Sequence, residues 1–453
     1  MRKVLLPVVL GFVMATTAVW AGQRSAASLA ITPPMGWNSW DSWGFTINQA
    51  EFKKTATWLH DYLQRYGYQY VVIDEGWFAR QPEKPAGQED YNISPNGLYM
   101  PAVNRFPSAA GGKGFAPLAA WVHSQGLKFG IHIVHGIPRS AVEKNERIAG
   151  SRYTAAEAAD TSDTCQWNSD NYGVKDNKAG QAYYDAMAKL YASWGVDFLK
   201  VDCISQPWNG PEIAMIRKAL DRSGRPIVLS LSPGPTPLAD GAAAAKYAQQ
   251  WRISNDVWDI WSYKSTPPPF PESVKGQFAR LAQWEPYAGP GHWPDADMLP
   301  IGYLGPHPGW GQPRHTRLTN TEVRTQFTLW SIGRSPLILG ANLLKMDAAT
   351  QSIITNPEVI AVDQYSQDNR QVIRKGDDVV WMASAPQHKG DYIAIFNLSD
   401  QAKTLTYTWK QLGITYGACP VRDLWARKEI GTHRSVTVTL APHASALYLA
   451  QHP

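Results

Sequence analysis

Short runs of apolar and β-branched residues recur along the chain and alternate with longer helical patterns. Helical spacing is clear at Met187, Leu190, Tyr191 and Trp194, which fall at positions i, i+3, i+4 and i+7. A strand that alternates with a helix eight times is typical of a (β/α)8 TIM barrel. The eight predicted strands span residues 34–40, 68–74, 128–134, 197–202, 226–232, 250–256, 291–295 and 335–340.

A doubly wound open sheet is the alternative architecture for this alternation. That fold binds its ligand at one switch point of the sheet, often beside a Gly-rich phosphate loop after the first strand. No such loop follows the first predicted strand, and polar residues end nearly every strand. We therefore expect a catalytic barrel over residues 31–364.

After about residue 365 the pattern changes to short strands in which apolar and polar residues alternate. Turn residues separate these strands, as in small antiparallel domains. The pattern predicts a C-terminal antiparallel β-sandwich over residues 365–453. Its predicted strands are 377–384, 390–399, 403–409, 434–440 and 444–450.

The first 21 residues have the features of a signal peptide. Arg2 and Lys3 precede an apolar stretch, and Val19 and Ala21 take the small-residue positions of a cleavage site. Residues 22–30 then form a linker, and no later run approaches the ~20 apolar residues that span a bilayer. We expect an exported protein, periplasmic or extracellular, with no membrane partner.

Composition narrows the range of partners. Removal of Arg2 and Lys3 lowers the formal net charge from +5 to +3, and no Lys/Arg-rich run indicates nucleic-acid binding. Twenty Trp and twenty Tyr can supply flat platforms for sugar rings, although most aromatic residues serve the core. Three cysteines survive cleavage, so one stays free or pairs between chains, and a homo-oligomer is left open.

Charged residues occur where a buried strand should have none, above all Lys200 and Asp202 in the run DFLKVDCIS. Such charges form either an internal ion pair or part of an active site. In a barrel, side chains at the C-terminal ends of the strands converge on one mouth. The strand ends supply Trp40, Asp74, Glu75, His132, Lys200, Asp202, Ser232, Arg252, Asp256 and Asp297.

Two carboxylates across such a mouth can cleave a glycosidic bond with retention of configuration. Asp202 is the candidate nucleophile, because Lys200 on the same strand face should keep it ionised. Asp256 is the candidate general acid and base, with Arg252 to orient it; the alternative for these two is a rim salt bridge. Asp74 and Glu75 are then acceptors for sugar hydroxyl groups.

Other chemistries find less support in the chain. His132 and His135 point to opposite faces of one strand, and no spaced His/Cys set completes a metal site. We therefore expect no metal. The sequence contains no G-x-S-x-G nucleophile elbow, so it does not support an esterase.

Five motifs, in order, resemble glycoside hydrolase family 27, the α-galactosidase family. They are PPMGWNSW at 33–40, YVVIDEGW at 70–77, FLKVD at 198–202, WRISNDVW at 251–258 and DADML at 295–299. The resemblance implies a (β/α)8 barrel with a β-sandwich, and cofactor-free hydrolysis of terminal α-D-galactosides with retention. It also implies a nucleophile at Asp202, an acid/base at Asp256, and a sugar site lined by Trp40, Asp74, Lys200 and Arg252.

Three departures from the family bear on the substrate. Glu75 stands where a second aspartate is usual, which resembles the β-L-arabinopyranosidases of the family, whose sugar is galactose without its C6 group. Ser232 replaces a glutamate near the sugar's 2-position, as in α-N-acetylgalactosaminidases, and His132 replaces a usual tyrosine. The resemblance also implies a disulfide between Cys165 and Cys203. A sugar-binding protein without activity is the remaining alternative, although both catalytic carboxylates are present.

Overall fold

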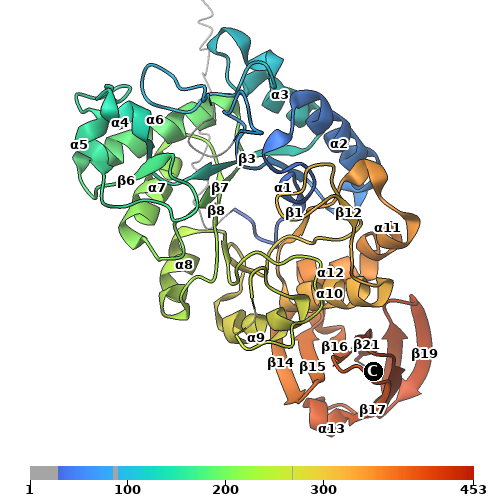
Figure 1. The fold of residues 1–453 in the computed structure, drawn as a ribbon. Helices are drawn as coiled ribbons and strands as arrows, with labels where there is room; N and C mark the ends of the chain where they lie inside the picture. Colours follow the sequence, from blue (N-terminus) through green and yellow to red (C-terminus); the bar gives the residue numbers. More distant parts are fainter. Residues whose placement is uncertain (1–28, 85–89, 268, 453) are drawn as a thin grey trace, which may run out of the picture.

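The eight predicted strands form one parallel barrel in the computed structural model, which describes residues 29–84, 90–267 and 269–452 (Figure 1). The predicted signal peptide lies outside these residues. Each strand pairs with the next one along the barrel in parallel register. The strands are β1 (Met35–Asn38), β2 (Tyr70–Ile73), β3 (Lys128–Val134), β7 (Phe198–Asp202), β8 (Val228–Leu231), β9 (Gln250–Arg252), β10 (Trp293–Asp295) and β13 (Leu337–Leu339).

The sheet closes on itself between its last strands and its first. Strand β13 pairs with β1, and a parallel bridge joins Leu299, just after β10, to Leu339 in β13. The Leu299 N–H donates to the Ile338 carbonyl at 2.8 Å, and the Gly340 N–H donates to the Leu299 carbonyl at 3.1 Å. The predicted barrel is therefore confirmed, and the C-terminal ends of the eight strands open on one side.

At least one helix lies between each pair of successive barrel strands and covers the outside of the sheet (Figure 1). The first begins at a capping box, in which the Asn48 side chain accepts from Glu51 and the Glu51 carboxylate accepts from the Asn48 N–H. The connecting helices are α2 (Gln49–Tyr62), α3 (Ala116–Ser124), α6 (Lys178–Trp194), α7 (Gly210–Arg222), α8 (Gly241–Tyr247), α9 (Val274–Trp284) and α10 (Asn320–Gly333), with α11 (Ala348–Ile354) and α12 (Pro357–Tyr365) after β13.

Longer connections at the open end carry small elements of their own. The short helix α1 (Trp40–Trp43) follows β1 directly. After β3 come β4 (Ile137–Pro138), α4 (Arg139–Glu143), α5 (Ala155–Ala158), β5 (Ala159–Asp160) and β6 (Asn171–Val174), and β4, β6 and β5 form a small sheet. After β10 the loop forms the two-stranded pair β11 (Tyr303–Leu304) and β12 (Arg314–His315).

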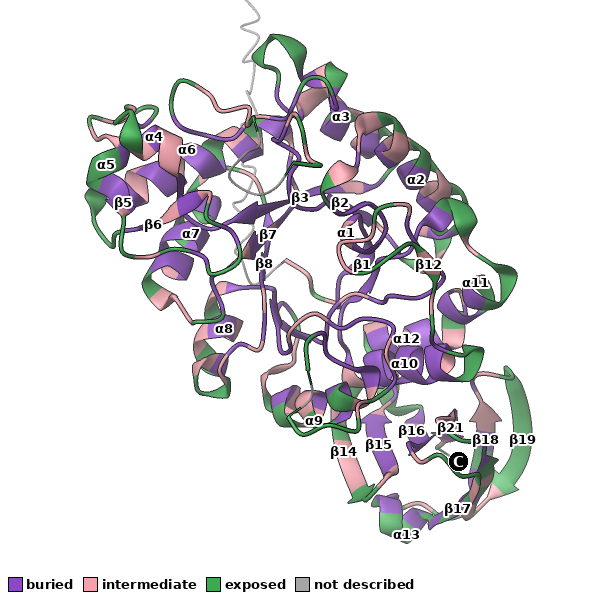
Figure 2. Cartoon of the chain, viewed as in Figure 1, coloured by how far each residue is buried: buried purple, intermediate pink, exposed green. Residues whose placement is uncertain are grey.

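The C-terminal region is an antiparallel β-domain of two sheets, as predicted. Six strands pair in the order β14-β15-β16-β21-β18-β19, and two further strands, β17 and β20, pair with each other. Figure 2 shows β19 as largely exposed, whereas the barrel strands are largely buried. The strand bounds are β14 (Gln367–Lys375), β15 (Asp378–Ser384), β16 (Gly390–Asn397), β17 (Lys403–Thr408), β18 (Cys419–Asp423), β19 (Lys428–His433), β20 (Ser435–Leu440) and β21 (Ser445–Gln451), with α13 (Trp409–Leu412) after β17.

The sandwich packs on the barrel through α9 and α10. Phe278 of α9 meets Phe396 of β16 edge to face, with ring centroids 4.9 Å apart, and Thr328 of α10 hydrogen-bonds to Ser445 at 3.0 Å. Buried apolar residues of both domains belong to one continuous core cluster. Within the described part of the chain, no helix is both long and apolar enough to cross a membrane.

Candidate active site

A cavity of about 930 Å³ opens at the C-terminal ends of the barrel strands. Its lining includes eight of the ten residues that the sequence predicts for the site: Trp40, Asp74, Glu75, Lys200, Asp202, Ser232, Arg252 and Asp256. The other two stand directly behind this lining. His132 contacts Asp202, and Asp297 forms an ion pair with Arg252.

Asp202, at the end of β7, is held by groups from its own strand end and from β3. Its Oδ2 lies 3.2 Å from the His132 Nε2, and its Oδ1 accepts the Cys203 N–H at 2.7 Å. Cys203 has a left-handed backbone with φ of 61°, which is unusual for a residue other than glycine. Only 14% of the Asp202 side chain is exposed. The carboxylate is therefore fixed in position rather than free to rotate.

Lys200 forms its ion pair with Asp74 rather than with Asp202. The Lys200 Nζ lies 2.9 Å from the Asp74 Oδ2, which also accepts from the Asn38 amide at 2.6 Å. The lysine still acts on Asp202 through its charge, as the sequence predicts, but His132 makes the direct contact with this carboxylate.

The positive charges on this side keep both aspartates ionised. Burial opposes ionisation of Asp202, but the His132 hydrogen bond and the charges of His132 and Lys200 together lower its pKa. Burial is likewise outweighed at Asp74, where Lys200 and His132 hold the pKa well below its usual range. His132 gains in return, because Asp74 and Asp202 raise its pKa despite its burial.

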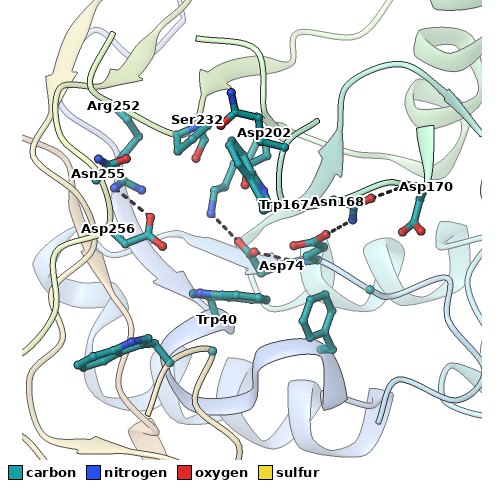
Figure 3. A pocket seen from close by; sticks show the side chains of 18 of the residues that line it. Trp40, Asp74, Trp167, Asn168, Asp170, Asp202, Ser232, Arg252, Asn255 and Asp256 are labelled. Carbon is teal, nitrogen blue, oxygen red and sulfur yellow. Dashed lines mark hydrogen bonds and ion pairs between the residues drawn. The ribbon is translucent and has the colours of Figure 1, made fainter. Parts of the chain in front are cut away.

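Unlike Asp74 and Asp202, Glu75 lies in surroundings that disfavour its ionised form. Burial raises the pKa of Glu75 to about 7, and the charges of Asp202 and Asp74 add to this effect. Its Oε1 accepts from the Asn168 amide at 2.7 Å, and 6% of the residue is exposed. Figure 3 shows Asn168 on the same side of the cavity as Asp74.

Asp256 faces Asp202 from the opposite side of the cavity (Figure 3). Arg252 of β9 donates from Nη2 to the Asp256 Oδ1 at 3.2 Å, and its Nη1 lies 2.8 Å from the Asp297 Oδ1. The Asp256 side chain is 35% exposed, whereas that of Arg252 is 3% exposed. Arg252 therefore connects a solvent-accessible carboxylate to a buried one.

Asp297 supports this side from behind and does not line the main cavity. Its Oδ2 accepts the Val257 N–H at 2.7 Å, and its backbone is left-handed with φ of 85°. Burial raises the pKa of Asp297 above its usual value although Arg252 favours the anion, because Asp256 and Asp295 add negative charge nearby. The sequence places Asp297 among the strand-end residues predicted for the sugar site, and in the structure it lies behind the cavity lining, in contact with Arg252.

The loop between β5 and β6 adds residues that sequence reasoning did not find. A disulfide joins Cys165 to Cys203, with the Cα atoms 5.7 Å apart, as the family resemblance implied. The disulfide ties the loop to the residue after Asp202. Next in the loop come Trp167, which is 48% exposed at the rim of the cavity, and Asn168, which holds Glu75. The only available signal was the position of both residues just after Cys165.

Two more residues become part of the site only because of where the fold places them. Asn38 lies inside the first family motif and donates to Asp74. Trp310 lies on the loop from β11 to β12 and lines the cavity together with Trp40. A lone tryptophan in a Gly/Pro-rich stretch has no periodicity or motif that marks it. These residues become candidates only once the loops are placed in space.

One group among the described residues has the makeup of a metal site. Ligand atoms of His135, Asp163 and Glu212 lie within 4.8 Å of one another. The Glu212 carboxylate already binds the His135 Nδ1 at 3.0 Å, the Asn209 amide at 2.8 Å and the Tyr184 hydroxyl. These hydrogen bonds occupy the Glu212 carboxylate. His135 faces this cluster whereas His132 faces Asp202.

A barrel with opposed carboxylates, an aromatic floor and acceptors for hydroxyl groups defines a glycosidase. Comparison with known proteins identifies the family. Residues 170–365 match the family model described as alpha galactosidase A, and residues 375–450 match that of the alpha galactosidase C-terminal beta sandwich domain. The chain belongs to glycoside hydrolase family 27, as its five motifs indicated.

Relatives at higher and lower identity match nearly the whole chain. The alpha-galactosidase of Cyamopsis tetragonoloba is 30% identical over 93% of this chain and 86% of its own. The crystal structure of a β-L-arabinopyranosidase of family 27 from Geobacillus stearothermophilus superposes with a TM-score of 0.89 at 42% identity, over 94% of this chain and 98% of its own. For alpha-galactosidase I of Mortierella vinacea the TM-score is 0.72 at 25% identity, over 94% of this chain and 100% of its own.

Proposed function

We propose that the protein is a retaining exo-glycosidase that removes terminal β-L-arabinopyranosyl residues in preference to α-D-galactosyl residues. The observation that carries this preference is the Glu75 carboxylate, which lines the cavity between Asp74 and Asn168. The two sugars differ by the C6 hydroxymethyl group. A side chain one methylene longer than aspartate takes up room that this group would need.

The proposed chemistry uses the two opposed aspartates. Asp202 attacks the anomeric carbon while the glycosidic C–O bond breaks, and Asp256 gives its proton to the departing oxygen. Asp256 then takes a proton from water, the water oxygen bonds to the anomeric carbon, and the Asp202 ester is released. The low pKa of Asp202 suits both steps, because it is an anion when it attacks and a stable anion when it leaves.

The remaining contacts fit a sugar ring held between these aspartates. Asp74 and Lys200 form a buried ion pair that offers both an acceptor and a donor to hydroxyl groups. Trp40 supplies an aromatic floor, and a Cβ at Gly309 would collide with its ring, so the loop can pack on this tryptophan only with glycine there. Ser232 lines the cavity with a small side chain, which also supports an α-N-acetylgalactosaminidase as a second candidate.

The test compares kcat/KM on nitrophenyl β-L-arabinopyranoside and nitrophenyl α-D-galactopyranoside. We expect the arabinoside to be preferred, and Glu75→Asp to shift the ratio toward the galactoside by about 10-fold or more, the size of methylene discrimination. Asp202→Asn serves as the blank, and Glu143→Asp, an exposed glutamate of α4, serves as the matched control. A wild-type preference for the galactoside that Glu75→Asp leaves unchanged would contradict the role of Glu75.

We also propose export of the protein through residues 1–21. The disulfide between Cys165 and Cys203 supports this, because such bonds persist in oxidising compartments. N-terminal sequencing of protein recovered from the periplasm or the medium tests it. A mature chain that starts at Gly22 is expected, and an intact Met1 on protein confined to the cytoplasm would overturn the proposal.

A further inference from the structure

Trp310 presents a partly exposed indole to the active-site cavity on the same side as Asp256. Its ring centroid lies 5.5 Å from that of Trp258, which follows Asp256 by two residues. The preceding residue, Gly309, donates its N–H to the Trp40 carbonyl at 3.0 Å. The indole therefore stands between the aromatic floor and the segment that carries the proposed acid/base.

Two arginines and one buried aspartate hold this tryptophan in place. The Arg314 guanidinium lies 5.3 Å from the Trp310 and Trp258 ring centroids, and that of Arg317 lies 5.4 Å from the Trp310 ring centroid. Arg314 also donates to the Trp310 carbonyl at 3.1 Å.

The Asp259 carboxylate accepts from both guanidinium groups, at 2.6 Å from Arg314 and 2.9 Å from Arg317. Burial opposes its ionisation, but the hydrogen bonds from Arg314 and Arg317 lower the pKa of Asp259 to about 2. Asp259 follows Asp256 by three residues, so this network ties the Trp310 loop to the acid/base segment.

This position is the one that a leaving group must occupy. A general acid protonates the departing oxygen, so the group attached to that oxygen lies beside Asp256, across the sugar ring from Asp202. An indole held by charged partners offers a flat apolar face at little entropic cost. The apolar C–H face of a second pyranose ring matches such a surface.

We propose that Trp310 is the stacking platform for a sugar in the leaving-group position, and that Asp259 is the positioning residue for this platform. The proposal rests on the proposed function and deepens it. The natural substrates are then terminal arabinopyranosides or galactosides linked to a second pyranose.

The experiment compares two substrates with the same terminal sugar. One is the glycosyl fluoride, whose leaving group is too small to reach Trp310, and the other is a disaccharide with a hexopyranose as leaving group. We expect Trp310→Ala to lower kcat/KM for the disaccharide about 3- to 10-fold more than for the fluoride, the usual worth of one aromatic contact. Trp310→Phe, which keeps a ring, should restore most of the disaccharide activity.

The control is Trp121→Ala on α3. Trp121 is also partly exposed and also contacts a cation, because the Lys53 Nζ lies 4.7 Å from its ring centroid. This control should leave the ratio of the two substrates unchanged. An equal loss on both substrates in Trp310→Ala, or no loss on either, would overturn the proposal. A selective loss in Trp167→Ala alone would also overturn it, because the leaving group would then lie on the Asp202 side. No turnover of the fluoride by the wild type would instead count against the proposed function.

Discussion

The two sides of the cavity hold the carboxylates that we propose as catalytic in different ways. On one side Asp202 is 14% exposed and is held by His132 and the Cys203 N–H, with the Asp74 and Lys200 ion pair beside it. On the other side Asp256 is 35% exposed, and its carboxylate is held by Arg252. Asp202 is thus nearly buried and held by more than one group, whereas Asp256 remains open to solvent.

This difference matches what the two proposed steps require. A nucleophile must be ionised and aimed at one carbon, so fixed positive charges and a rigid setting favour it. A general acid and base must exchange its proton in every cycle, so contact with water and freedom of movement favour it. The asymmetry is therefore an argument for the assignment of roles that is independent of the family motifs.

Removal of the nucleophile should have the largest effect. Asp202→Asn keeps the shape but removes the attacking charge, and we expect kcat to fall by on the order of 10⁴-fold or more. Calorimetry with arabinose should still show binding, because Trp40, Asp74 and Lys200 remain. Asp61→Asn, exposed on α2, is the matched control and should keep full activity. Substantial turnover in Asp202→Asn would refute the assignment.

Removal of the acid/base should have a smaller effect that depends on the leaving group. Asp256→Asn should slow hydrolysis of a disaccharide by about 10²- to 10⁴-fold, because the departing oxygen then leaves without a proton. The fluoride needs no such proton, so its first step should be affected less. Added azide, which needs no general base, should accelerate the second step. Equal losses on both substrates without azide rescue would mean that Asp256 has another role.

Substitution of Glu75 should show, through the pH dependence of protein stability, that the positive charges near Asp202 do not keep Glu75 ionised. Its folded pKa of about 7 lies above the ordinary glutamate pKa of 4.5, so its contribution to stability is fully present below pH 4.5 and is lost as pH rises through 7. Glu75→Gln cannot ionise. The variant should therefore gain stability relative to the wild type between pH 4.5 and 8, by on the order of 3 kcal/mol at most.

Denaturant unfolding of both proteins at the two pH values measures this difference. Glu143→Gln, at an exposed position, should give the same stability difference from the wild type at pH 4.5 and pH 8. A pH-independent difference for Glu75→Gln would show that Glu75 stays charged in the folded protein.

Much of the fold could be predicted from periodicity, because a buried strand has a recognisable pattern in its own sequence. All eight barrel strands lie within the predicted ranges, since a strand buried by helices is apolar along its length. In the sandwich the sequence missed β14, β18 and β19. Strands β14 and β19 lie at the two edges of the six-stranded sheet and are largely polar, so no alternating pattern marks them.

The residues of the candidate site likewise fall into those that the sequence reveals and those that it does not. Residues at strand ends, such as Asp74, Lys200 and Asp202, could be found from the sequence because the barrel brings strand ends together. Asn168, Trp167 and Trp310 could not be found, because they lie on loops whose course depends on distant contacts. Those contacts are the disulfide for the first two residues and the Asp259 network for the third.

Local patterns in the sequence were enough to predict the barrel, the sandwich, the family and the two opposed aspartates. Each of these depends on patterns a few residues long, which local burial and strand geometry impose. The pairing of polar side chains became visible only in the folded chain: Lys200 with Asp74, His132 with Asp202, Asn168 with Glu75, and Arg252 between Asp256 and Asp297. Side-chain pairing across strands and loops depends on positions tens of residues apart, and only the folded chain brings those positions within a hydrogen bond's reach.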